Sequence, residues 1–181
     1  MKNAHLIIII LYTLPFLARG QEDLFYRNYT TQQGLTSNLI YDLFEARSGL
    51  IYLGTGAGLT AFNGISFKLY PSAGLRSFSV HEIQEDPNGQ IWCLNFSNQL
   101  LYLEGDSLKV FDKLQAILDG AGTVKSFLLH KEGIYILCDK TLYWSTYDGQ
   151  ARELLRVNES WLNNAWVSLI RGEQEDEILI S

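Results

Sequence analysis

The sequence has little of what most often marks a metal site, a disulfide framework or a nucleic-acid-binding surface. It contains two cysteines and three histidines in 181 residues. Two cysteines do not make a disulfide framework. Basic residues are outnumbered, because 14 Lys and Arg stand against 20 Asp and Glu, and the net charge is -6. We therefore expect no metal, no cofactor, and no attraction to nucleic acid or to an anionic membrane surface.

Long hydrophobic runs are also missing, apart from one at the amino terminus. Lys2 precedes the apolar run LIIIILYTLPFLA (Leu6–Ala18), and small residues follow it before Gln21. This pattern predicts a signal peptide over residues 1–20 and an exported, periplasmic chain. The alternative is a retained membrane anchor. The run is shorter than the ~20 residues that a spanning helix needs, and Pro15 interrupts it, so cleavage is favoured.

What the sequence does have is an internal repeat. The stretch GLTSNLIYDLFEARSGLIYLG begins at Gly34, and GLRSFSVHEIQEDPNGQIWCL begins at Gly74. A third copy contains SFLLHKEGIYIL (Ser126–Leu137), and a fourth begins with AWVSLIRGEQEDEILIS (Ala165–Ser181). The period is about 40–44 residues, which is typical of propeller blades and other repeat arrays.

Each copy contains four short apolar segments separated by turn residues. In the first copy they are Leu39–Glu45, Leu50–Gly54, Leu59–Phe62 and Ile65–Tyr70. Four strands per repeat predict an all-β fold made of β-propeller blades with four antiparallel strands, incomplete at about three and a half blades. No segment has a sustained helical period. The nearest is FDKLQAIL (Phe111–Leu118), which lies between copies.

The glycines in LGTGAGLTAFNG (Leu53–Gly64) raise the question of a phosphate-binding loop. A dinucleotide fingerprint needs glycines at G-x-G-x-x-G and a helix that follows at once. Leu59 occupies the third position, and the chain turns again at Asn63-Gly64. The second copy has Leu94, Phe96 and Asn98 where the first has Gly54, Gly56 and Gly58. We therefore predict a hairpin and not a nucleotide site.

The repeat divides the chain into six predicted segments. Residues 21–33 are predicted as an outer strand that would close the ring of a full propeller. The remaining segments are the signal peptide (1–20), blade 1 (34–73), blade 2 (74–122), blade 3 (123–163) and the truncated start of blade 4 (164–181).

The first two copies resemble the two-component regulator propeller repeat. The residues that carry the resemblance are GLTSNLIYDLFEARSGLIYLGTGAGLTAFNGISFKLY and IQEDPNGQIWCLNFSNQLLYLEGDSLKVF. In that family, found in Bacteroidetes sensors, such propellers form the periplasmic part of histidine kinases or hybrid two-component systems. The resemblance implies a non-catalytic, ligand-sensing module in front of an inner-membrane anchor, further blades and cytoplasmic signalling domains. It implies an unknown small-molecule or oligosaccharide ligand, and it allows a dimer of the full-length sensor.

Two other functions remain open at this stage. One is a fragment of a secreted carbohydrate-active propeller enzyme, and the other is a truncated product without function. No kinase phosphoacceptor motif, ATP-binding pattern, lipase-type Ser motif or Ser-His-Asp arrangement is recognisable. We therefore assign no catalytic, cofactor-binding, metal-binding or ligand-binding residue from the sequence.

The residue types that can carry chemistry have simpler structural explanations in this sequence. His81 and His130 lack ligand-type neighbours at metal spacing. The carboxylates Glu45, Glu85 and Asp86 repeat with the blades, which favours a role in turns over a pair of catalytic carboxylates. Asp86, Gly89 and Trp92 only loosely resemble the Asp-box turn of sialidase-type propellers, because Pro87 stands where that box has its Asp.

The remaining candidate functional residues are aromatic residues, cysteines and the asparagines of glycosylation sequons. Tyr52, Trp92 and Tyr135 recur at equivalent positions and are expected in the core. Three further aromatic residues fall outside the repeated positions: Tyr147, Trp161 and Trp166. They are better candidates for an exposed stacking surface than the recurring aromatic residues. Even so, core packing is the expected place for each of them. Cys93 and Cys138 are expected as buried free thiols that face different neighbours. The N-x-S/T sequons begin at Asn28, Asn95 and Asn158 and matter only in a eukaryotic host.

Overall fold

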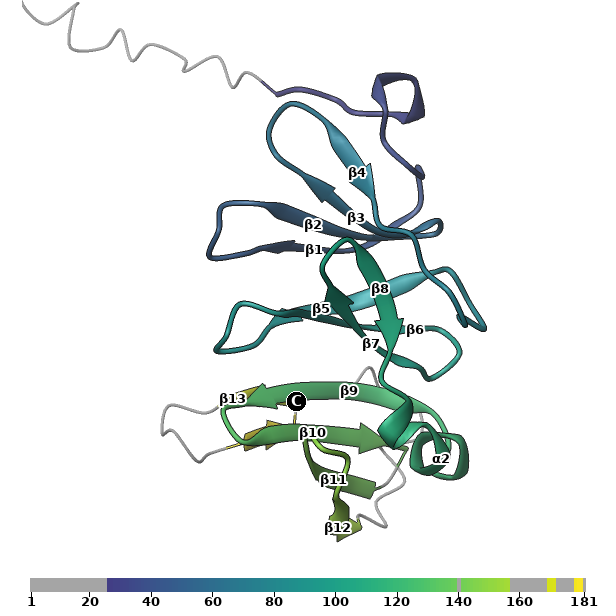
Figure 1. Ribbon diagram of the computed structural model, residues 1–181, viewed down its shortest axis with the longest axis vertical. Coiled ribbons are helices and arrows are strands. Elements are labelled where there is room, and N and C mark those ends of the chain that lie inside the picture. Colours follow the sequence, from purple (N-terminus) through teal and green to yellow (C-terminus); the bar gives the residue numbers. More distant parts are fainter. Residues whose placement is uncertain (1–25, 140, 157–168, 172–177, 181) are drawn as a thin grey trace, which may run out of the picture.

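The computed structural model describes residues 26–139, 141–156, 169–171 and 178–180. Three four-stranded antiparallel sheets follow one another along the chain, and a two-stranded sheet follows them. Figure 1 shows the three large sheets stacked along the long axis. The first contains β1 (Ile40–Glu45), β2 (Ile51–Thr55), β3 (Gly58–Phe62) and β4 (Phe67–Leu69). The second contains β5 (Val80–Glu85), β6 (Ile91–Asn95), β7 (Leu100–Glu104) and β8 (Ser107–Val110).

The third sheet contains β9 (Val124–His130), β10 (Gly133–Cys138), β11 (Thr141–Thr146) and β12 (Ala151–Arg156), and β13 (Leu169–Arg171) pairs with β14 (Ile178–Ile180). In each large sheet the strands pair in sequence order. The first strands of successive sheets contact one another, β1 with β5, β5 with β9 and β9 with β13. This is the arrangement of blades in a propeller, and the predicted all-β class and four-stranded blades are confirmed. We call the sheets blades 1 to 3 and the β13–β14 pair the start of blade 4.

Turn chemistry at the predicted glycines fixes the hairpins. Gly56 and Ala57 form the two-residue turn between β2 and β3, so the predicted hairpin is confirmed. A Cβ atom on Gly54 would lie 2.5 Å from the carbonyl oxygen of Val80 in blade 2. Only glycine allows the two blades to approach this closely. The glycines of this stretch therefore serve a turn and a blade contact.

The core lies between the blades and not within any one of them. Tyr52, Leu59, Ile83 and Cys93 belong to a buried cluster shared by blades 1 and 2. A second cluster joins blades 2 and 3, and a smaller one joins blade 3 to Leu169 of blade 4. A single blade has no core of its own, so each depends on its neighbours for burial of apolar area.

A helix forms between blades 2 and 3, where the sequence pattern predicts none. Helix α2 (Asp112–Gly120) connects blade 2 to blade 3, and Figure 1 shows it following the end of β8. Its Leu114 and Leu118, one helical turn apart, are both 1% exposed and pack into the cluster between blades 2 and 3. Burial of this short apolar stripe, which spans too few turns for a periodicity signal, makes the segment helical.

The segment before blade 1 does not form a strand over residues 26–30. A short 3-10 helix, η1 (Thr31–Gln33), follows, and a capping box made by Thr30 and Gln33 begins it. Tyr29 packs edge-on against Phe62 and Phe67, with ring centroids 5.0 and 5.4 Å apart. This places the segment beside the outer hairpin of blade 1, and ring closure by residues 21–33 stays a prediction.

Candidate functional site

Exposed and half-buried aromatic rings gather where the first strands of blades 1 and 2 begin. Tyr41 lies in β1, His81 in β5 and Phe96 in the turn between β6 and β7. The ring of Phe96 lies 4.9 Å from that of Tyr41 and 4.5 Å from that of His81, measured between centroids. Phe96 is 54% exposed and Tyr41 is 45% exposed. We call these three side chains the aromatic patch.

The turn that carries Phe96 is held by a buried asparagine. The Asn95 Oδ1 atom accepts hydrogen bonds from the backbone N–H groups of Ser97 and Gln99, each at 3.0 Å. Its Nδ2 atom donates to the carbonyl oxygen of Ser77, also at 3.0 Å. These contacts fix the turn, and the Phe96 ring that it carries stays about half exposed beside Tyr41 and His81. Sequence reasoning missed this role, because Asn95 was considered only as the start of a sequon.

His81 is a half-buried member of the patch. Burial lowers the pKa of its imidazole, and the neighbouring Asp42 carboxylate opposes the shift. These influences together favour the neutral form of the ring. Together with Tyr41 and Phe96 it offers faces and edges for stacking against a flat apolar part of a ligand. The expectation of a structural or surface histidine fits this position.

Three side chains form a regular series of hydrogen bonds between blades. Each lies near the start of a first strand and accepts a hydrogen bond from a backbone N–H in the following blade. With their donors they are Asp42 (from Ile83, 2.5 Å), Glu82 (from Phe127, 2.9 Å) and Ser126 (from Leu169, 3.0 Å). We call them the inner-strand acceptors. Their spacing follows the repeat, and the sequence places Ser168 at the next equivalent position.

Each inner-strand acceptor lies at an irregularity of its strand. The register of β1 shifts between Ile40 and Asp42, that of β5 shifts between His81 and Gln84, and β9 has a shift beside Ser126. A β-bulge changes the direction in which the neighbouring side chains point. Here the bulges coincide with the side chains that contact the next blade.

Glu82 is a half-buried acid in this series. Burial raises the pKa of its carboxyl to about 7, against the opposing effect of hydrogen bonds from Ser126 and the Phe127 backbone. Gln84 makes the neighbouring contact to blade 3, accepting from Leu129 N–H at 3.2 Å and donating to the Phe127 carbonyl oxygen. Blades 2 and 3 are therefore joined by polar side chains as well as by the apolar cluster.

The carboxylates that repeat with the blades lie at or beside the other end of the first strands, and Asp86 holds a turn there. Asp86 is buried, and its Oδ1 accepts hydrogen bonds from the backbone of Asn88 and Gln90 at 2.8 and 2.9 Å. Glu85 pairs with the guanidinium of Arg47 in blade 1 at 3.2 Å. Glu45, the third of these residues, is exposed. Asp86 therefore holds a turn and Glu85 a contact between blades 1 and 2, whereas Glu45 ends β1 in an exposed position.

The recurring aromatic residues and the cysteines alternate between the two faces of each blade. Tyr52 faces blade 2 and Trp92 faces blade 3, while Tyr135 packs against the cluster that includes Leu169. Cys93 packs toward blade 1 and Cys138 toward blade 2. Both thiols are free and buried, as expected. Burial raises the pKa of both, that of Cys138 to about 12, so they carry no thiolate at neutral pH.

The other predicted candidates do not join the aromatic patch. His130 packs near Tyr135 and Trp144 in blade 3. The hydroxyl of Tyr147 donates to the His130 carbonyl oxygen at 2.8 Å, and its ring packs against Trp92. Trp161, Trp166 and Asn158 lie outside the described residues. Within the described part of the chain, no three His, Cys, Asp or Glu side chains lie close enough to hold a metal ion.

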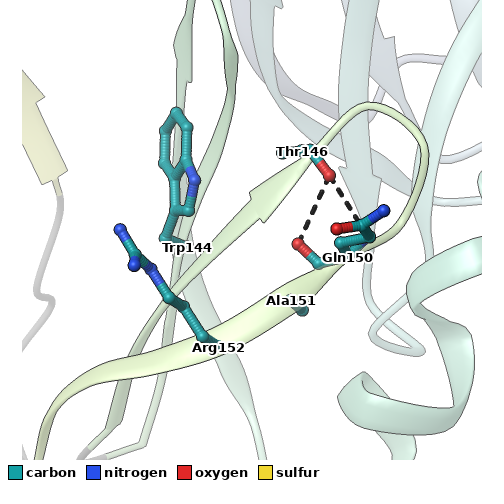
Figure 2. Close-up of a pocket in the computed structure, with 5 residues that line it drawn as sticks. All are labelled: Trp144, Thr146, Gln150, Ala151 and Arg152. Carbon is teal, nitrogen blue, oxygen red and sulfur yellow. Dashed lines mark hydrogen bonds between the residues drawn. The ribbon is translucent and has the colours of Figure 1, made fainter.

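A pocket of about 370 Å³ lies on the outer hairpin of blade 3. Trp144 and Arg152 flank it in Figure 2, and Thr146 is hydrogen-bonded to the backbone of Gln150 beside them. Ala151 completes the described lining. The hairpin comprises β11 and β12, the third and fourth strands of the blade, so the pocket is remote from the first strands and from the aromatic patch.

Comparisons with known proteins agree with the fold. The extracellular domain of a hybrid two-component system from B. thetaiotaomicron matches with a TM-score of 0.58 at 17% identity, covering 75% of this chain and 22% of that chain. The corresponding domain of a second such system from the same organism matches with a TM-score of 0.59 at 15% identity, covering 93% and 22%. The class of protein that the repeats resemble is thus found among the structural neighbours.

A similar fold also occurs in an enzyme. A catalytically inactive virginiamycin B lyase from Staphylococcus aureus, solved with quinupristin, matches with a TM-score of 0.58 at 14% identity, covering 78% of this chain and 48% of that chain. No protein-family model and no curated protein matches the sequence. The chain spans about a fifth of the length of the two sensor domains. Within its described residues, no helix has the length and apolar character needed to cross a membrane.

Proposed function

We propose that this chain is part of the ligand-sensing propeller, outside the cytoplasm, of a two-component sensor, and that it is not itself catalytic. The observation that carries the proposal is the aromatic patch, which two blades build where their first strands begin. The fold shared with extracellular sensor domains supports it. The predicted signal peptide over residues 1–20 and the resemblance of the repeats point the same way.

The patch fits binding better than catalysis. It offers stacking surfaces, and two of the three repeating carboxylates, Asp86 and Glu85, are engaged in a turn and in a contact between blades. A ligand that contacts blades 1 and 2 together would favour one relative position of these blades, and so pass a signal along the chain. A small molecule or an oligosaccharide is the expected ligand. Further blades, a membrane anchor and cytoplasmic signalling domains of the same protein are the proposed partners.

The binding test uses the purified chain and a panel of glucan, xylan, arabinan and galactan oligosaccharides, measured by calorimetry. We expect one class to bind, and Phe96→Ala to weaken binding by about threefold to tenfold through loss of stacking. Ile65→Ala is the matched control, because Ile65 is 88% exposed in the outer turn of blade 1. Binding that is unchanged in Phe96→Ala, or absent for the whole panel, would contradict the proposal.

The sensor assignment has a separate test in the gene. Reading the DNA beyond codon 181 should show further blades, an apolar span of ~20 residues and a kinase module in the same frame. A stop codon followed by unrelated sequence would instead support a truncated product. Carboxylates essential for hydrolysis of a glycan would support the secreted enzyme.

A further inference from the structure

Glu82 is the end of a chain of hydrogen bonds that spans three blades. Its Oε1 atom accepts from the backbone N–H of Phe127 at 2.9 Å and from the hydroxyl of Ser126, both on β9. The Ser126 Oγ atom accepts in turn from the backbone N–H of Leu169 on β13 at 3.0 Å. Because the single hydroxyl proton of Ser126 is given to Glu82, the chain has one direction, from blade 4 through blade 3 to blade 2.

The backbone at Glu82 is held in an unfavourable conformation. Its φ of +50° lies in the left-handed region, which is costly for a residue with a Cβ atom. The register shift between His81 and Gln84 surrounds it. This bulge directs the carboxyl toward β9, where it is largely shielded from water. Strain of this kind in the middle of a strand indicates a specific role for the side chain.

The charges around Glu82 do not neutralise it. Asp42, which faces it from β1, is a like charge that raises its pKa further. Strands β2 and β6 carry no Asp, Glu, Lys, Arg or His. On β9, the Lys125 ammonium lies 4.0 Å from the Asp139 carboxylate in a pair of its own, and His130 packs against Tyr135 and Trp144. Burial is the largest influence on Glu82 and raises its pKa from 4.5 to about 7.

We propose that Glu82 is a proton-binding site that sets how firmly blade 2 is joined to blades 3 and 4. The neutral acid suits the half-buried contact between the blades, where a charge is poorly solvated. The ionised carboxylate favours opening of the contact to water, where the charge is solvated. This regulation by pH is independent of the ligand of the proposed sensor, and it would act on the path between blades that such a sensor uses.

The direction of the effect follows from the two pKa values. The folded chain keeps the Glu82 proton to a higher pH than the unfolded chain, whose glutamates titrate near 4.5. The stabilising effect of the bound proton is complete below about pH 4.5 and is lost as the pH rises toward 7. The contact between blades therefore loosens between pH 5 and 7 and changes little beyond 8.

The test is hydrogen–deuterium exchange of the purified chain between pH 5 and 8, corrected for the intrinsic pH dependence of exchange. As the pH rises from 5 to 8, protection of the Phe127 and Leu169 amides against exchange should fall by about tenfold or more. The Leu53 amide in blade 1 is the reference for this change. Glu82→Gln should remove this pH dependence. Glu104→Gln, at an exposed glutamate of β7 in the same blade, is the matched control and should keep it. A pH dependence that survives in Glu82→Gln would overturn the proposal.

A second variant keeps the test decisive if Glu82→Gln does not fold. Ser126→Ala removes a hydrogen bond that lowers the pKa of Glu82, so the midpoint of the transition should move to higher pH. The carbon chemical shift of the Glu82 carboxyl should titrate with the same midpoint. A midpoint that does not move, or a carboxyl that titrates near 4.5, would also overturn the proposal.

Discussion

At the scale of single residues, the contact between blades 1 and 2 is limited by one glycine. The α-carbon of Gly54 faces the Val80 backbone, and a methyl group there would lie 2.5 Å from the carbonyl oxygen, a backbone atom that cannot rotate away. The blades would have to separate to admit it. Gly54, which resembles part of a phosphate loop in the sequence, is thus required for the close packing of blades 1 and 2.

Gly54→Ala should therefore destabilise the chain by about 1–3 kcal/mol, which is the usual cost of overpacking a tight contact. Urea unfolding followed by tryptophan fluorescence measures this loss. Gly120→Ala is the control, because nothing lies within 4 Å of a Cβ atom at this position and its φ is not in the left-handed region. Equal stability of Gly54→Ala and the unmodified chain would show that the blades do not pack as described.

At the scale of elements, helix α2 is held more by burial of its leucines than by a surface ion pair. Leu114 and Leu118 fill the contact between blades 2 and 3. Asp119 on the same helix pairs with Arg76 at 2.6 Å, but both side chains are about half exposed. Water and salt screen a pair of this kind, whereas nothing replaces lost apolar contacts.

We therefore expect Leu114→Ala to lower the free energy of unfolding by about 2–5 kcal/mol, as buried leucine truncations do. Asp119→Ala should have a far smaller effect, and that effect should shrink further in 0.5 M salt. Thermal and urea unfolding of the two variants at low and high salt gives the comparison. A larger loss for Asp119→Ala would mean that α2 is held by charge and not by its apolar stripe.

Elements also show what could be predicted from the sequence. The repeat predicted the four strands of blade 1 to within two residues at each end, because turn residues such as Asn63-Gly64 are local signals. Helix α2 was not predicted, because two leucines one turn apart are too few for a periodic pattern. The inner-strand acceptors were also missed, since the bulges that aim Asp42, Glu82 and Ser126 at the next blade arise only when the sheets stack.

The aromatic patch illustrates the same limit. Tyr41, His81 and Phe96 are separated by 40 and 15 positions and share no motif. They meet because β1 and β5 lie side by side and because Asn95 fixes the turn between β6 and β7. A sequence names the residue types of a surface, but the contacts between blades decide which of them come together.

At the scale of the whole molecule, blade 1 presents an open apolar face. Leu43 is 62% exposed on it, whereas Ile83, at the equivalent position of blade 2, is 5% exposed because blade 1 covers it. Leu39 is also 62% exposed. By the internal symmetry of the repeat, this face has the shape that accepts another blade-like sheet. In solution the isolated chain should bury it against a second copy.

Sedimentation of residues 21–181 at increasing concentration should therefore show self-association. Leu43→Lys should shift the population toward monomer, because a charge at the centre of this face cannot be buried without a partner. Ile65→Lys, at an outer turn position that is 88% exposed, should leave the association unchanged. If residues 21–181 remain a sharp monomeric species that melts cooperatively, then blade 1 tolerates an uncovered face, and its exposed leucines are available to a ligand instead of a neighbouring blade.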